Sequence, residues 1–133
     1  MIIKTVSLED YFNSKISNLN CRTDTRAYIS STLDKYKNTV PDFADKSLTL
    51  EYSEAKFNFS FQKYQELGDW LFFMESMYPE ALKGASKEYY NSIAQSAYYK
   101  CYVMMNRSWI LFEEIADKFP DLIIQMRVEM QAV

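Results

Sequence analysis

The sequence predicts an all-α domain of six or seven helices around one central apolar helix. Apolar residues recur at three- and four-residue spacing through most of the 133 positions, which is the period of a helix face. Glycine and proline, which punctuate turns, number only two and three. Apolar residues make up 48% of the chain, enough for one core at this length. We therefore expect residues 1–133 to form a single domain.

The first two helices are expected near the N-terminus. Ser7 and the acidic residues after it resemble a capped helix start, so we predict a first helix over Leu8–Leu19. A second helix, capped by Thr23 or Asp24, is expected to run to about Lys37.

The next segment, 47–61, follows a loop marked by residues 40–42 and fits two structures. Its apolar residues alternate with polar ones over 48–52 and 57–61, as in a β-hairpin. The intervening turn, however, lacks the Gly, Asn, Asp or Pro that hairpin turns favour. A helical stripe is also present at Leu48, Tyr52, Ala55 and Phe59. We therefore predict a short helix.

The central helix is predicted over residues 59–78, where apolar content is densest. Pro79 disfavours helical backbone at the preceding residue and should end this helix. Gly68 lies in the apolar stripe, where glycine costs roughly 0.5–1 kcal/mol relative to alanine. We therefore expect another backbone to pack closely against Gly68, at the small residues Ala94 and Ala97 of a later helix.

Two helices are expected between the central one and Pro120. Ser86 is a suitable N-cap for a long helix that ends near Met105, and Ser108 is a suitable N-cap for the next. Glu114 precedes Lys118 by four residues, a spacing that favours an ion pair on the helix surface.

Pro120 suits the first position of a last helix, which is expected to end near Gln131. This helix is apolar on two sides. One side should face the core, and the other, with Ile124 and Val128, is where we expect a second subunit to pack.

Composition and charge exclude several classes of protein. A net charge of −3 and scattered basic residues argue against nucleic-acid binding. The longest wholly apolar runs, such as 70–74, are far shorter than a membrane span, and the N-terminus does not resemble a signal peptide. We therefore expect a cytoplasmic protein without membrane association, with Cys21 and Cys101 as buried thiols.

Histidine is absent from the sequence. Because histidine is the usual general base and the commonest transition-metal ligand, its absence excludes Ser-His-Asp triads, Cys-His pairs and histidine-rich metal sites. We expect no cofactor.

The second half of the chain resembles a family of small bacterial helical proteins of uncharacterised activity. The family pattern is Leu-Gly-Asp, an aromatic pair before Pro-Glu, a tyrosine pair and a later Ala-Tyr. Met77 stands in place of an aromatic residue, and Ser76 in place of glycine. The resemblance implies helices and bacterial origin, and brings no reaction, ligand or partner. The matching residues are Leu67, Gly68, Asp69, Met77, Tyr78, Pro79, Glu80, Tyr89, Tyr90, Ala97 and Tyr98.

An enzymatic alternative depends on carboxylates at helical spacing. Two facing acidic pairs could hold Mg²⁺, which prefers oxygen ligands. This arrangement is similar to that of all-α nucleotide pyrophosphohydrolases of the MazG type, although the order and spacing of their motifs are not reproduced. The residues concerned are Glu66, Asp69, Glu113, Glu114 and Asp117.

Asp69 is the most informative carboxylate, because it lies beside Gly68 near the apolar stripe. A buried carboxylate needs a partner, and we expect a tyrosine hydroxyl, a basic side chain or a helix N-terminus. With Trp70, Tyr90 and Tyr98, Asp69 could also line a small-molecule pocket. Our leading hypothesis is a non-enzymatic protein that acts through protein contacts as a homodimer, and a small-molecule binding module is the second.

Overall fold

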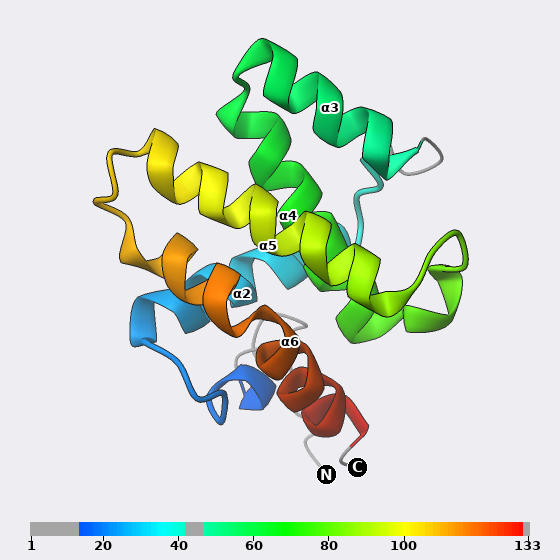
Figure 1. Cartoon of the computed structure of the whole chain (residues 1–133). Coiled ribbons are helices and arrows are strands. Elements are labelled where there is room, and N and C mark those ends of the chain that lie inside the picture. The colour runs from blue at the N-terminus through cyan, green and yellow to red at the C-terminus, as the bar shows by residue number, and fades with distance from the viewer. Residues whose placement is uncertain (1–13, 42–46, 132–133) are drawn as a thin grey trace, which may run out of the picture.

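The structure, a computed structural model, describes residues 14–41 and 47–131, which form helices and the connections between them (Figure 1). No strand occurs in these described ranges, so the predicted all-α class is confirmed. The elements are α2 (Thr23–Tyr36), α3 (Leu48–Asn58), α4 (Phe61–Met77), the short 3-10 helix η1 (Pro79–Ala81), α5 (Lys87–Met104) and α6 (Ile110–Gln131).

The N-terminal predictions are tested only in part. The start of the first predicted helix, with Ser7, lies outside the described residues, as does Asp42 of the predicted loop. Residues 14–16 are helical, so this helix ends three residues before the predicted Leu19. The second helix is confirmed, because α2 ends within one residue of the predicted Lys37. Its predicted cap is wrong, because Thr23 and Asp24 lie inside the helix and the N-cap residue Arg22 makes no side-chain capping bond.

The ambiguous segment forms the predicted helix, α3. The Ser47 hydroxyl caps it by accepting from the Leu50 N–H, and Ala55 is fully buried against the rest of the protein. The Tyr52 hydroxyl also makes a hydrogen bond with Ser96 of α5. The predicted inner stripe was wrong at Phe59, which follows the helix and is 82% exposed.

Helix α4 is the central element, as predicted, and its ends lie within two residues of the expected bounds. It contacts α2, α3, α5, α6 and η1, and its largest interface is with α5, which crosses it in Figure 1. A helix surrounded in this way must be apolar on most of its circumference. Buried apolar side chains from each of the helices α2 to α6 form one core around it.

The last two predicted helices are in fact one, because α6 continues through Pro120. Proline lacks an N–H, so the carbonyl of Ala116, four residues earlier, loses its helical partner. The side-chain amide of Gln95, on α5, donates to this carbonyl at 2.9 Å. A contact from a neighbouring helix thus replaces the missing hydrogen bond, and α6 does not end.

The cap at the start of α5 is confirmed, and the next one is not. Ser86 Oγ accepts from the Tyr89 N–H at 3.1 Å. The Ser108 hydroxyl, however, donates back to the Met105 carbonyl, and α6 begins two residues later, at Ile110.

The cysteines and the helix lengths can be compared with the expectations of buried thiols and no membrane span. Neither cysteine forms a disulfide. Cys101 is buried as expected, but Cys21 is only partly buried. In the part of the chain that the structure describes, the helices are too short or too polar to cross a bilayer.

Candidate functional site

A buried carboxylate on α4 joins three helices. Asp69 is 6% exposed and accepts hydrogen bonds from the hydroxyls of Tyr28, on α2, and Tyr98, on α5. The Tyr28 hydroxyl lies 2.8 Å from each carboxylate oxygen, and Tyr98 lies 2.8 Å from Oδ1. Gln65 Nε2 donates to the Tyr28 hydroxyl at 2.9 Å. Of the three kinds of partner expected for Asp69, the structure shows the tyrosine hydroxyl. We call Tyr28, Gln65, Asp69 and Tyr98 the Asp69 network.

Burial sets the protonation of this network. Removal from water raises the pKa of Asp69 to about 7, while the hydroxyls of Tyr98 and Tyr28 and the charge of Lys35 lower it. Burial also raises the pKa of both tyrosines far above the ordinary value, so their hydroxyls remain donors. Because both Asp69 oxygens accept from fixed protein donors, the geometry favours a structural tie between α2, α4 and α5.

The close approach expected at Gly68 is made by a side chain and not by a backbone. A Cβ atom at Gly68 would lie 2.9 Å from Cε2 and Cζ of the Tyr98 ring. This ring crosses Gly68 so that its hydroxyl can reach the neighbouring Asp69. Ala94 and Ala97 are buried on α5, but they are not among the nearest atoms. The expectation of backbone contact is therefore wrong, because the space serves the Asp69 network.

A cavity of about 340 Å³, lined by polar and charged residues, opens beside the network. Tyr28, Asp69 and Gln65 line its inner side, and Lys35 and Glu66 also contribute to its wall. Since Asp69 already accepts two hydroxyls, the cavity presents no unpartnered buried carboxylate.

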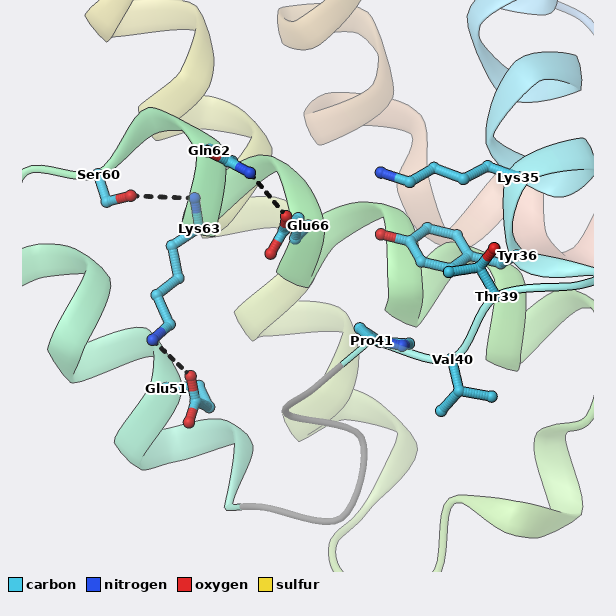
Figure 2. A pocket seen from close by; sticks show the side chains of 10 residues that line it. All are labelled: Lys35, Tyr36, Thr39, Val40, Pro41, Glu51, Ser60, Gln62, Lys63 and Glu66. Atoms are coloured by element: carbon cyan, nitrogen blue, oxygen red, sulfur yellow. Dashed lines mark hydrogen bonds and ion pairs between the residues drawn. The ribbon is translucent and has the colours of Figure 1, made fainter.

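A neighbouring cavity of about 480 Å³ lies between the end of α2 and the start of α4 (Figure 2). Lys35 extends toward it from α2, while Gln62 and Glu66 face it from α4. Gln62 Nε2 donates to Glu66 at 3.1 Å, and Lys63 forms an ion pair with Glu51 at 2.8 Å. Most charged groups around this cavity are therefore satisfied within the protein.

The four residues predicted for a binding pocket fall into two pairs. Asp69 and Tyr98 belong to the network, whereas Trp70 and Tyr90 line a separate cavity of about 290 Å³. The Tyr90 hydroxyl accepts from the Gly84 N–H at 3.0 Å, and the Trp70 ring packs against other core aromatic rings. The predicted set thus does not converge on one pocket.

The residues of the enzymatic alternative are also dispersed. Glu114 accepts from the Arg22 N–H at 2.9 Å and forms the predicted ion pair with Lys118 at 3.2 Å. Asp117 is exposed, whereas Asp69 is buried. Within the described ranges, no group of three acidic or cysteine side chains lies close enough together to hold a metal ion. Glu66 and Glu113 therefore take part in no such group either.

Sequence analysis missed a second buried carboxylate on α4. Glu75, on α4, is 3% exposed, and burial raises its pKa to about 7 against the opposing charges of Lys87 and Arg127. The Asn91 amide, with its nitrogen toward Glu75, donates to both oxygens at 2.8 and 3.0 Å. A charged residue directly after the apolar run 70–74, within the most apolar predicted helix, was the signal that could have revealed it.

A markedly apolar hollow lies on the surface, and sequence analysis missed this as well. It has a volume of about 720 Å³ and lies between the α3–α4 turn and the last turns of α5. Phe57 and Phe59, on one rim, are 85% and 82% exposed. We call it the phenylalanine groove. It is lined by Ser53, Lys56, Phe57, Phe59, Tyr64, Lys100, Val103 and Met104.

The backbone at Phe59 is in the left-handed region, with φ 49° and ψ 45°. The Ser60 N–H donates to the Ala55 carbonyl and the Phe59 N–H to the Lys56 carbonyl, which is the Schellman helix ending. Glycine usually occupies this position, because a side chain there costs roughly 1–2 kcal/mol. The protein thus holds an exposed phenylalanine in an unfavourable conformation.

Comparison with protein-family models, curated proteins and solved structures finds no match to this chain.

Proposed function

We propose that this protein acts without catalysis, by binding further copies of itself through the phenylalanine groove. The observation that carries the proposal is the pair of phenylalanines on the rim, both more than four-fifths exposed. Apolar surface gathered at one groove is typical of protein interaction sites, whereas isolated apolar residues are common on any surface.

The conformation of Phe59 supports this proposal. Residues held in sparsely populated backbone regions cluster at functional sites, where the strain is offset by another benefit. In the monomer Phe59 contributes little burial, since its side chain is 82% exposed. Burial of the ring in an assembly would offset the conformational free-energy cost of the left-handed backbone at Phe59.

The two carboxylates buried on α4 are better suited to a structural role than to catalysis. Asp69 accepts hydrogen bonds from Tyr28 and Tyr98, and Glu75 accepts from Asn91. Both carboxylates are engaged by side chains from neighbouring helices, which suits a role in holding helices together.

We propose further that the protein acts in the cytoplasm of a bacterium. The unpaired thiols of Cys21 and Cys101 are compatible with a reducing compartment. The bacterial assignment depends on the Leu-Gly-Asp and Pro-Glu resemblance in the second half of the sequence.

The test is a groove variant that carries Phe57→Ala and Phe59→Gly. Removing the strained side chain should stabilise the monomer by about 1 kcal/mol, which corresponds to a rise in Tm of about 4 °C. Self-association should nevertheless be lost. Thermal unfolding and sedimentation velocity over a concentration series measure the two effects.

A matched control replaces two other exposed apolar residues, Val40→Ala and Leu50→Ala, which are 71% and 70% exposed and do not line the groove. We expect this control to assemble like the wild type. A wild type that remains monomeric throughout the series, or a groove variant that still assembles, would contradict the proposed function.

A further inference from the structure

The exposed side of α6 carries a stripe of two acidic and two apolar residues. Asp117, Asp121, Ile124 and Val128 follow one another at four-, three- and four-residue spacing. At 3.6 residues per turn they lie within an arc of about 60° and extend over about 16 Å. All four are exposed, Ile124 by 53% and Val128 by 60%. We call these residues the α6 stripe.

The two aspartates of the α6 stripe are not neutralised by basic side chains within the described part of the chain. Neither Asp117 nor Asp121 forms an ion pair there. The phenylalanine groove has the opposite character, because its charged lining residues are Lys56 and Lys100, which form no ion pair with a described residue either. Each surface therefore combines apolar side chains with unpaired charged groups. These groups are positive in the phenylalanine groove and negative on the α6 stripe.

We propose that the phenylalanine groove of one molecule takes the α6 stripe of a second copy. In this arrangement Ile124 and Val128 cover the exposed phenylalanine rings, and the two aspartates face the two lysines. Complementary charges at the edge of an apolar contact set its orientation and exclude the opposite pairing. This inference rests on the proposed function and names the occupant of the groove.

The groove cannot be filled by α6 of its own molecule. Within the described residues α3 and α6 make no contact with each other, although α3 contributes one wall of the groove. Figure 1 shows the last turns of α6 at the opposite end of the view from the α3–α4 turn. The α6 stripe must therefore come from a second molecule.

The pairing of two different surfaces has a consequence for the form of the assembly. In a symmetric dimer the same patch meets itself, whereas a groove that binds a stripe leaves one groove and one stripe open. Further copies can then bind at these open surfaces, so the assembly becomes a closed ring or an open filament of subunits. The predicted homodimer would be only the first step.

The test uses a stripe variant, Asp117→Lys with Asp121→Lys, beside the groove variant defined above. Like charges then face each other across the contact, and we expect association to weaken by at least about a hundredfold. A control with the same change in net charge carries Glu80→Lys and Glu88→Lys, both at exposed positions outside the two surfaces. The control should assemble like the wild type.

Mixing the two variants provides the decisive measurement. The stripe variant keeps an intact groove and the groove variant keeps an intact α6 stripe, so one working contact remains between them. We expect each variant alone to be monomeric, and the equimolar mixture to form a 1:1 dimer and nothing larger in sedimentation velocity.

The outcomes separate this inference from the proposed function. If the groove variant is monomeric but the stripe variant assembles like the wild type, the groove mediates assembly with another occupant and only this inference is overturned. A mixture that stays monomeric overturns it too. If the groove variant itself still assembles, the proposed function fails first.

Discussion

At the residue scale, Gly68 and Tyr98 show how one absent side chain makes room for a polar contact. The Tyr98 ring is 1% exposed, stacks on Phe112 and hydrogen-bonds to Asp69 through its hydroxyl. Because the ring is held at both its face and its hydroxyl, it has little freedom to move aside. The glycine is therefore required by packing, and its cost in helix propensity is offset by the Asp69 network.

The first prediction concerns Gly68→Ala. The substitution gains up to about 1 kcal/mol in helix propensity, but places Cβ 2.9 Å from two atoms of the Tyr98 ring. Overpacking a filled core typically costs about 1–3 kcal/mol, so we expect a net loss of about 1 kcal/mol in the free energy of unfolding. Urea denaturation measures it.

A second background separates overpacking from other effects of the alanine. In a Tyr98→Leu protein the ring is gone, so Gly68→Ala should be neutral or stabilising there. Equal losses in both backgrounds would show that the Tyr98 ring is not the cause.

At the element scale, α6 owes its continuity to α5. A proline in the interior of a helix normally breaks or kinks it, at a cost of about 3 kcal/mol. Here the carbonyl of Ala116 accepts from Gln95 instead. The long α6 keeps the stripe residues before and after Pro120 on a single helix face.

The second prediction is a double-mutant cycle on this contact. Gln95→Ala alone leaves the Ala116 carbonyl without its partner and should cost about 1–2 kcal/mol of unfolding free energy. In a Pro120→Ala background the backbone N–H of residue 120 can donate to that carbonyl, and the same change should cost about 0.5 kcal/mol or less. The four proteins are compared by urea denaturation. Equal costs in both backgrounds would contradict the proposed role of Gln95.

At the scale of the whole molecule, stability depends on two carboxylates buried on α4. Asp69 faces Tyr28 and Lys35 from α2, Tyr98 from α5 and Glu66 on its own helix. Burial raises the pKa of both Asp69 and Glu75 to about 7. In the unfolded chain such groups titrate near pH 4.

The third prediction follows from the sign of these shifts. Between about pH 4 and pH 7 the folded state holds more protons on these two groups than the unfolded state does. Their contribution to stability is therefore fully present below pH 4 and is lost as the pH rises through 7. Each group lowers the free energy of unfolding by up to about 1.4 kcal/mol per pH unit within this window.

Urea denaturation at pH 5 and pH 8 tests this prediction. The double variant Asp69→Asn with Glu75→Gln should remove the fall in the free energy of unfolding between these two pH values, whatever its effect on stability at either pH alone. A control with two exposed carboxylates replaced, Glu88→Gln and Asp117→Asn, should keep it. If the first variant loses as much stability as the wild type between the two pH values, the buried carboxylates are not responsible.

The sequence was sufficient for the fold class and for most of the helix boundaries. Helical periodicity, the cap at Ser86 and the stop at Pro79 act over one or two turns of chain, so local pattern contains their signal. For the same reason α4 could be identified as central, because a helix that is apolar on most sides must be surrounded. Asp69 could be assigned a partner, since a carboxylate near the core requires one. A tyrosine hydroxyl, a basic side chain and a helix N-terminus all satisfied this requirement, and local sequence did not decide between them.

Only the tertiary structure decided which distant residues meet. The contacts between Gly68 and Tyr98 and between Gln95 and Ala116 join different helices, so neither the reason for the glycine nor the tolerance of Pro120 could be read from local spacing. The exposure of Phe59 depends on how α3, α4 and α5 pack, and the groove beside it exists only after they do. The sequence by itself determined the helices through local periodicity, whereas the surfaces available for binding were decided by long-range packing.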